Sequence, residues 1–311
     1  MADRITCLGS GNIYLDRIIV REYPEGCEKQ RTFKDNLQYE EVGGTCGNVM
    51  AILPHLGIST FPMLRSDLGR ESSVIKESLE EYGADTRFVT SGPDGGCYIL
   101  DCNHRQDKDG RAFAKFRKRG PNGSMFAKQR FLNMEDAVSF AEGLDFVPDV
   151  FFFDNQAAGH YCIANVLRPK GTLVYFEPEG YDGKVGAFRK RVDASDIIKY
   201  SGEKILDESW QEGYTDKLFI KTLKEEGVAF SLRGGKWQVV PPVANDNVVD
   251  TEGAGDTLTS AFIAELCKGG HLKASELTED IVREALQKAQ ELASRSVSYL
   301  GSKGMIHNND K

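Results

Sequence analysis

The stretch Asp250-Thr251-Glu252-Gly253-Ala254-Gly255-Asp256 stands in the last third of the chain. Val248-Val249 ends an extended apolar run just before it, and Leu258 and Phe262 lie four residues apart just after it. That spacing is typical of a helix, so the glycines stand where a loop enters a helix. This transition decides the prediction of both the fold and the site.

The start of a helix suits a phosphate. Backbone N–H groups there have no partner within the helix, and the helix dipole adds positive potential. Gly253 and Gly255 carry no side chain that would block a close approach. Asp256 puts a carboxylate inside this anion-binding turn, which suits a base that takes a proton beside a transferred phosphoryl group. The alternative interpretation is a capping aspartate in a structural glycine turn.

A second glycine motif, Gly43-Gly44-Thr45-Cys46-Gly47-Asn48, leads into a short helical run in the first third of the chain. Paired glycines allow a hinge or a close backbone approach. Asn48 can both donate and accept a hydrogen bond, which suits a sugar hydroxyl, although a structural turn is the alternative. We expect Pro54 to kink or weaken the helix.

Length and composition limit the class of protein. The 311 residues suit one large α/β domain or two ordinary ones, and because no linker divides the chain we predict a single domain over 1–311. Apolar residues make up 40% and charged residues 28%, which excludes a disordered chain. With 39 basic and 47 acidic residues the net charge is −8, so neither nucleic acid nor a membrane is an expected partner.

The cysteines and the apolar runs predict a cytoplasmic protein. Seven cysteines are scattered without a Cys-x-x-Cys pair, which is typical of a reducing compartment and argues against a zinc cage. No apolar signal segment follows Met1, and the longest apolar stretch, Val150–Phe153, is far too short to span a bilayer.

The chain alternates short β-rich runs with helical periods, which predicts an α/β fold with a largely parallel sheet covered by helices. Helices are expected over 71–82 and 278–300, with Gly301 as a left-handed cap. Two stretches, approximately 16–42 and 95–120, lack helical periodicity and carry turn residues at 23–26 and 107–110, so we expect a hairpin-like flap there. The expected buried strands are Ile5–Leu8, Val150–Phe153, Leu173–Phe176 and Leu218–Ile220.

Several other motifs are incomplete. Gly9-Ser10-Gly11 begins like a dinucleotide fingerprint but lacks the third glycine, which argues against a dehydrogenase. The sequence has no P-loop, no Gly-x-Ser-x-Gly elbow and no histidine pair with metal-ligand spacing.

Taken together and in this order, the two glycine motifs resemble those of the ribokinase-like (PfkB) family of small-molecule kinases. That family has Gly-Gly-x-x-x-Asn before a helix in the first third and Asp-Thr-x-Gly-Ala-Gly-Asp opening a helix in the last third, and the sequence matches both. Asp16 stands at the family's sugar-binding aspartate, Asp67-Leu68-Gly69 fits the stretch before the next helix, and Thr222–Gly227 resembles a nucleotide-binding run.

The resemblance implies a three-layer α/β/α sandwich with a mostly parallel central sheet and a small β-sheet lid. It also implies ATP-dependent phosphorylation, with Mg²⁺, of a hydroxyl on a small sugar or sugar derivative, and it allows a homodimer through the lid. The implied catalytic groups are the base Asp256 and the amides of Gly253, Ala254 and Gly255. The implied substrate, nucleotide and metal contacts are Asp16, Gly43, Gly44 and Asn48, then Thr222, Lys224, Gly227, Thr251 and Gln290, and lastly Glu203.

Some positions depart from the family pattern. Lys224 replaces a glycine, Tyr200–Glu203 keeps a glutamate without the usual asparagine, and Glu177-Pro178-Glu179 stands where Asp-Pro-Asn is common. Gln290 replaces an asparagine that is frequent near the adenine. These changes leave open a nucleotide- or sugar-binding regulator without turnover, although a pure binder has no need of the base at Asp256. A kinase acting on a nucleoside is a further alternative.

The lid run Arg111–Arg119 concentrates positive charge in an acidic protein. If it is extended, Phe113, Lys115, Arg117 and Arg119 share one face. An inward basic face, with Arg117 on the substrate, favours an acidic or phosphorylated sugar. The alternative is a solvated strand edge whose charge opposes aggregation.

Overall fold

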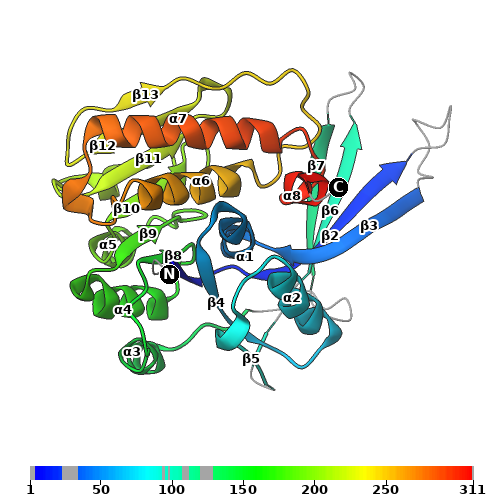
Figure 1. The fold of residues 1–311 in the computed structure, drawn as a ribbon, viewed down its shortest axis with the longest axis horizontal. Coiled ribbons are helices and arrows are strands. Elements are labelled where there is room, and N and C mark those ends of the chain that lie inside the picture. The colour runs from blue at the N-terminus through cyan, green and yellow to red at the C-terminus, as the bar shows by residue number, and fades with distance from the viewer. Residues whose placement is uncertain are drawn as a thin grey trace.

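The computed structural model describes residues 4–22, 34–92, 95–96, 99–106, 112–119 and 129–309. In this part of the chain the main sheet has nine strands, and every neighbouring pair from β5 to β11 is parallel. Two antiparallel strands complete one edge (Figure 1). Across the sheet the order is β13 (Gln238–Val240), β12 (Val228–Leu232), β11 (Leu218–Thr222), β10 (Ile197–Ser201), β9 (Leu173–Phe176), β8 (Val150–Phe153), β1 (Thr6–Ser10), β4 (Ser59–Ser66) and β5 (Val89–Ser91).

The two strands β8 and β9 are apolar throughout, as expected for strands that helices cover on both faces. Phe152 of β8 packs with the helices of one face, and its neighbours Phe151 and Phe153 pack with those of the other face. The first face carries α1 (Thr45–Ile52), α2 (Arg70–Glu81), α6 (Ala254–Lys268) and α7 (Glu279–Ser296). The second carries α3 (Met134–Glu142), α4 (Ala158–Leu167) and α5 (Val185–Asp193). The α/β fold with a mostly parallel sheet is therefore confirmed.

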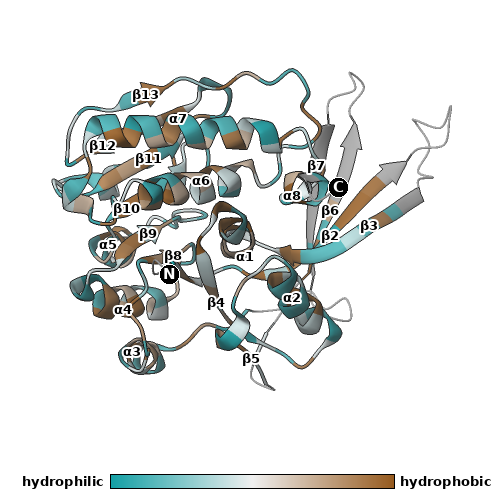
Figure 2. Ribbon diagram, in the orientation of Figure 1, coloured by the Kyte–Doolittle hydropathy of each residue, from teal (hydrophilic) through white to brown (hydrophobic). Residues whose placement is uncertain are grey.

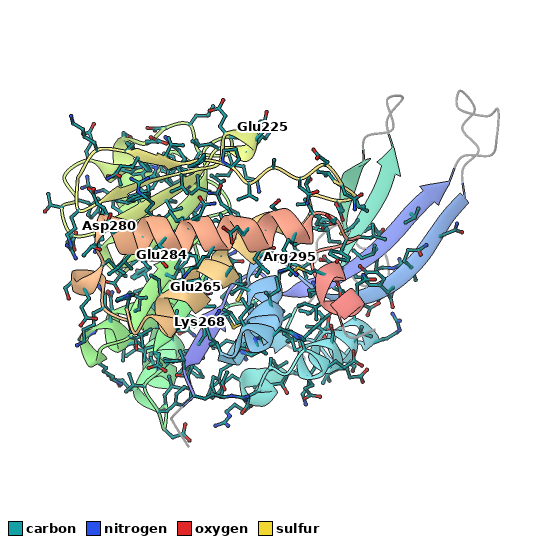
Figure 3. The ribbon with its side chains drawn as sticks, turned by 45° about the horizontal axis from the view of Figure 1, so that its top comes forward. Glu225, Glu265, Lys268, Asp280, Glu284 and Arg295 are labelled. Atoms are coloured by element: carbon teal, nitrogen blue, oxygen red, sulfur yellow. The ribbon has the colours of Figure 1, made fainter. Side chains whose placement is uncertain are left out.

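Two helices on the first face, α2 and α7, show the expected amphipathic pattern. Figure 2 shows α7 with hydrophilic and hydrophobic residues alternating along its length. Its outer surface and that of α6 carry charged side chains, among them Glu265, Lys268 and Glu284 (Figure 3). Lys268 forms an ion pair there with Glu265, and Lys288 forms ion pairs with both Glu265 and Glu284. These partly exposed ion pairs contribute little to the stability of the fold.

The end of α7 differs from the prediction. The helix ends at Ser296 instead of continuing to 300, because the carbonyl of Val297 accepts the amides of Val249 and Asp250. Gly301 does have a left-handed φ of 76°, but it lies beyond the helix and its amide donates to Asp250 Oδ2. The segment after α7 is therefore tied to the loop that precedes α6.

A second, four-stranded sheet stands beside the main body at the edge near α8 (Gly304–Asn309) (Figure 1). Its order is β3 (Lys34–Gly43), β2 (Tyr14–Glu22), β6 (Ile99–Gln106) and β7 (Ala112–Arg119). This confirms the small sheet expected from 16–42 and 95–120, while the turns at 23–26 and 107–110 lie outside the described residues. Tyr39 of β3 donates a hydrogen bond to the carbonyl of Leu300 at 2.9 Å, which links this sheet to the segment after α7.

Two smaller predictions concern the cysteines and membrane spans. Cys7, Cys46, Cys102, Cys162 and Cys267 are all free thiols and buried. No helix within the described ranges is both long and apolar enough to cross a bilayer.

Near the second glycine motif, α1 ends at Ile52, and a 3₁₀ turn that contains Pro54 follows it.

Candidate active site

The loop Asp250–Asp256 is held in shape by its own residues and by the segment after α7. Asp250 accepts the amide of Glu252 at 3.0 Å and the amide of Gly301 at 2.8 Å. Gly253 is the N-cap of α6 with a φ of 72°, and a Cβ there would lie 2.2 Å from Ser302 Cβ. Only glycine fits this position, because a side chain would be strained and would also displace Ser302.

The first amides of α6 are available to a ligand. The Thr257 amide donates to Gly253 O at 2.8 Å, and the Ala254 amide makes a longer bond of 3.4 Å to Thr251 O. The amides of Gly253, Gly255 and Asp256 donate to no group in the part of the chain that the structure describes. Unpaired amides at the positive end of a helix form a cradle for an anion such as a phosphoryl group.

Asp256 lies in the first turn of α6 and is partly exposed. Its Oδ2 accepts a hydrogen bond of 2.6 Å from Asn48 Nδ2 of α1. Burial and the negative charge of Glu177 raise the pKa of Asp256 to about 6, against the opposing effects of Asn48, Lys199 and Lys303. The alternative of a capping aspartate is wrong, since the cap is Gly253 and no side chain caps the helix. A carboxylate with this pKa is ionised at pH 7 and is a stronger base than an ordinary aspartate.

In the second glycine motif, Gly43 makes room for Asp16 of β2, and Gly44 makes room for the backbone of Asn12. A Cβ on Gly43 would lie 1.9 Å from the Asp16 carboxyl group. Gly44 has a φ of 83°, and a Cβ there would lie 2.3 Å from the Asn12 carbonyl oxygen. Asp16 is 2% exposed, and its Oδ1 has no hydrogen-bond partner among the described residues. A buried acceptor in this state is suited to a hydroxyl or another donor of a ligand.

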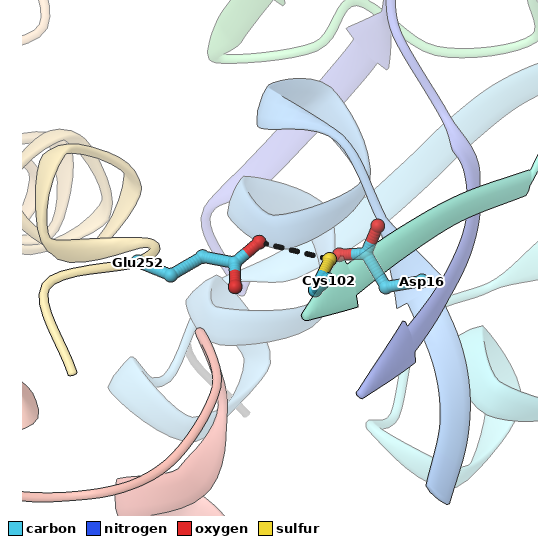
Figure 4. Close-up of side chains that lie close together, drawn as sticks. All are labelled: Asp16, Cys102 and Glu252. Carbon is cyan, nitrogen blue, oxygen red and sulfur yellow. Dashed lines mark hydrogen bonds between the residues drawn. The ribbon is translucent and has the colours of Figure 1, made fainter. Parts of the chain in front are cut away.

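Asp16 lies beside Cys102 and Glu252, which come from β6 and from the loop before α6 (Figure 4). The Cys102 thiol donates to Glu252 Oε1 at 3.2 Å. Burial, followed by the charge of Glu252, raises the pKa of Asp16 well above its usual value. Burial, followed by Asp250, raises the pKa of Glu252 to about 7. This side of the site therefore concentrates acidic groups, and burial together with their mutual repulsion makes each of them harder to ionise.

A buried lysine faces this acidic group from the segment after α7. Lys303 is completely buried and donates to Asn48 Oδ1 at 2.6 Å, and Ser302 Oγ donates to the same oxygen at 3.0 Å. Lys303 also forms an ion pair of 3.2 Å with Glu41 of β3. The predicted sugar contact Asn48 is thus engaged by the protein's own groups at both ends of its amide. Sequence reasoning missed Lys303, Glu41 and Glu252, and only Glu252 had a signal, since it stands inside the quoted motif.

A second buried lysine, Lys199, connects the start of α6 to the main sheet. Lys199 of β10 donates to the Gly255 carbonyl at 2.9 Å and forms an ion pair with Glu177, which follows β9. Glu177 Oε2 accepts a 2.6 Å hydrogen bond from Thr259 in the second turn of α6. These bonds fix the helix start relative to the sheet, and sequence reasoning missed them as well.

The predicted nucleotide contacts gather at the ends of β10 and β11. Thr222 ends β11, and its carbonyl accepts the amide of Gly202 at 3.1 Å. Lys224 has a φ of 55° and forms an ion pair with Glu203. Gly227 has a φ of 95°, and a Cβ there would lie 2.4 Å from Val240 O.

The other two predicted nucleotide contacts belong to different elements. Gln290 of α7 donates its side-chain amide to Pro241 O at 3.0 Å, so that donor is already used by the backbone. Thr251 is exposed in the loop before α6.

Among the residues that the structure describes, no group of three metal-ligating side chains lies on the nucleotide side. Glu203, the predicted ligand, pairs with Lys224, and its side chain is 56% exposed. Both oxygens of Glu177 are engaged by Lys199 and Thr259. Within the described ranges, the group with metal-ligand spacing is Asp16, Cys102 and Glu252, which lies on the lid side. The described residues on the nucleotide side therefore do not fit a resident ion.

The prediction for the basic lid face lies largely outside the described side chains. β7 includes Phe113, Lys115, Arg117 and Arg119, but the structure describes only the backbone of these residues. Arg117 therefore stays a predicted substrate contact.

Comparison with known proteins confirms the resemblance and the fold. A family model described as pfkB family carbohydrate kinase matches residues 202–309, a range that contains the Asp250–Asp256 motif. No curated protein matched the chain in a sequence search.

Several solved structures share the fold over nearly the whole chain. A ribokinase from Giardia lamblia is 17% identical with a TM-score of 0.70, covering 96% of each chain. An uncharacterized sugar kinase from Pyrococcus horikoshii in complex with ATP is 18% identical with a TM-score of 0.67, covering 95% of this chain and 93% of that one. A nucleoside kinase from Burkholderia thailandensis in complex with inosine is 17% identical with a TM-score of 0.66, covering 96% and 92%.

Proposed function

We propose that the protein is an ATP-dependent kinase that phosphorylates a hydroxyl of a small sugar or sugar derivative. The observation that carries the proposal is the position of Asp256 in the first turn of α6, next to unpaired backbone amides and with a pKa of about 6. A base and an anion cradle at one helix start are the two parts that phosphoryl transfer requires.

In the proposed reaction, the substrate hydroxyl lies between Asp16 and Asp256. Asp256 accepts the hydroxyl proton as the new oxygen–phosphorus bond forms and the bond from the γ-phosphorus to ADP breaks. The amides of Gly253, Gly255 and Asp256 donate to the oxygens of the migrating phosphoryl group. The four-stranded sheet covers the substrate and keeps water away, which favours transfer to the sugar over hydrolysis of ATP.

ATP as the donor is supported by the family model and by the ATP complex of the Pyrococcus horikoshii neighbour. We expect it to bind along Thr222, Lys224, Gly227 and Gln290, with its γ-phosphate at the start of α6. The assay includes Mg²⁺ because kinases transfer a phosphoryl group from a complex of ATP with that ion.

The proposal places the reaction in the cytoplasm, where ATP is present and thiols stay reduced. The proposed homodimer through the lid, the four-stranded sheet, can be tested by sedimentation.

The test is a panel of sugars, sugar acids, sugar phosphates and nucleosides with ATP and Mg²⁺, read by sugar-dependent ADP release. We expect Asp256→Asn to lower kcat by about 10²–10⁴-fold while ATP binding is kept, because the variant cannot take the proton. Asp280→Asn, on the exposed first turn of α7, is the matched control and should keep normal turnover. Near-normal activity of Asp256→Asn would contradict the role of the base.

Two other functions are alternatives that the same panel tests. The Burkholderia thailandensis neighbour was solved with inosine, which makes a nucleoside the second candidate acceptor. A regulator without turnover is motivated by the Glu203–Lys224 ion pair, which occupies two predicted ligand-binding side chains. Such a regulator would bind ATP and sugar with no ADP release from any acceptor in the panel.

A further inference from the structure

Lys303 lies in the turn between α7 and α8, and its side chain is completely buried. Its ammonium group has three donors and no acceptor. The ammonium donates hydrogen bonds to Asn48 Oδ1 at 2.6 Å and Ser302 Oγ at 2.7 Å, and it forms an ion pair with Glu41 Oε1 at 3.2 Å. Burying a charged group costs desolvation free energy even when the group is paired, so a fully buried lysine at this place needs a physical explanation.

The contact with Asn48 fixes which end of the amide faces Asp256. Since Lys303 and Ser302 both donate to Oδ1, the NH₂ group of Asn48 points the other way and donates to Asp256 Oδ2 at 2.6 Å. Rotating the amide by half a turn would set its NH₂ group against the ammonium and its oxygen against a carboxylate. Lys303 therefore holds Asn48 as a hydrogen-bond donor to Asp256.

Lys303 is itself held by the lid sheet through Glu41 of β3. Glu41 accepts hydrogen bonds from Tyr82 and from His307, the latter at 3.1 Å. Burial would raise the pKa of Glu41, but Lys303, together with these bonds, outweighs burial and lowers it. A chain of contacts thus runs from the lid sheet through Lys303 and Asn48 to Asp256.

We propose that Lys303 is a positioning residue for the phosphoryl transfer, which acts by orienting Asn48 against the Asp256 carboxylate. This inference rests on the proposed kinase function, in which Asp256 is the base. The ammonium does not need to touch the sugar. Its effect reaches the reacting atoms through one amide group, so it should change turnover far more than ATP affinity.

The charged groups that act on Asp256 come from several elements. Glu177, Asp16 and Glu252 are acidic, and Lys199 and Lys303 are basic. Removing Lys303 takes away one basic neighbour and frees Asn48 to rotate, and both changes make the carboxylate harder to ionise. The titration of Asp256 should therefore move to higher pH in a Lys303→Met variant.

The experiment compares Lys303→Met with Lys217→Met. Lys217 is also a buried lysine, 2% exposed, but it pairs with Asp216 next to β11, away from the site. For Lys303→Met we expect kcat to fall about 10- to 100-fold, as for a displaced catalytic group, with the KM for ATP within about threefold. The acid limb of the kcat–pH profile should move to higher pH. Lys217→Met should lose stability without either change.

A second measurement does not depend on turnover. In protein labelled with ¹⁵N-asparagine, the side-chain amide of Asn48 should titrate with Asp256, with a midpoint near pH 6. The midpoint should rise in Lys303→Met and stay unchanged in Lys217→Met. If Lys303→Met does not fold, Glu41→Gln/Lys303→Met removes both buried charges and should show the same two effects.

The outcomes separate this inference from the proposed function. An unchanged midpoint, or a kcat within threefold of the parent, overturns the role of Lys303 even if the protein is an active kinase. If the parent protein releases no ADP with any sugar, the kinase proposal is contradicted, and the positioning role of Lys303 is contradicted with it. A raised midpoint together with a reduced kcat supports the inference.

Discussion

At the scale of single residues, the site is built from carboxyl groups that hold protons more tightly than usual. The pKa of Asp256 is raised to about 6 and that of Glu252 to about 7, in both cases first by burial. A raised pKa means that the folded state binds the proton more strongly than the unfolded chain does. Protonation therefore stabilises the fold at low pH, and that stabilisation is lost as pH rises through the folded-state pKa.

Glu252→Gln tests this linkage. The contribution of Glu252 is fully present below its ordinary pKa of 4.5 and disappears as pH approaches 7. The variant cannot ionise, so at pH 8 it should be more stable than the parent by about 1–3 kcal/mol. At pH 4.5 the two should differ little in urea unfolding. Glu284→Gln, which replaces an exposed carboxylate on α7, should show no such pH dependence.

At the scale of elements, the start of α6 and the turn after α7 form one packed unit. Gly253 leaves no room for a side chain against Ser302, and Gly301 donates its amide to Asp250. Lys303 in the same turn contacts Asn48 of α1. The geometry of the base therefore depends on how closely these two segments approach each other.

Gly253→Ala should break this unit. Alanine with a left-handed φ costs about 1–2 kcal/mol, and the clash with Ser302 adds roughly 1–3 kcal/mol of overpacking. Gly57→Ala is the matched control, because Gly57 has a φ of 91° and a Cβ there would meet nothing within 4 Å, so only the first cost applies. We expect a larger loss of unfolding free energy in Gly253→Ala, accompanied by a fall in kcat. Equal losses in the two variants would contradict the packing argument.

At the scale of the whole molecule, the lid sheet and the main sheet enclose a site that is rich in acidic groups. Asp16, Glu41, Glu252 and Asp256 lie there, and Lys303 forms an ion pair with Glu41, which also accepts a hydrogen bond from His307. Acidic groups buried together raise one another's pKa, and an anionic substrate beside them would meet the same repulsion. The arrangement favours a neutral acceptor over the acidic or phosphorylated sugar that an inward Arg117 would bind.

A comparison of matched substrates tests this preference. We expect kcat/KM for a neutral sugar to exceed that for its sugar acid or sugar phosphate by at least about tenfold, which corresponds to about 1.4 kcal/mol. Raising the salt concentration should narrow the difference only slightly, because buried charges are weakly screened. A higher kcat/KM for the anionic sugars would assign the decisive role to the basic face of β7. Arg117→Gln would then be the variant that reverses it.

The local features of the protein could be predicted from its sequence. The apolar runs at Val150–Phe153 and Leu173–Phe176 became strands with those bounds, and the glycine motif at Asp250–Asp256 opens a helix. Such features depend on hydrogen bonds and periodicity within a few neighbouring residues, which the sequence displays directly. The end of α7 was predicted too late because a distant segment uses the Val297 carbonyl.

The chain of contacts that holds the base was decided by the tertiary structure alone. Asn48 contacts Asp256 across 208 positions of sequence and Lys303 across 255. No local pattern records which buried donor meets which acceptor, because that match is fixed only when the sheet brings α1, α6 and the turn after α7 together. The sequence thus determined which groups could do the chemistry, and the packing of distant segments determined their orientation and their charge.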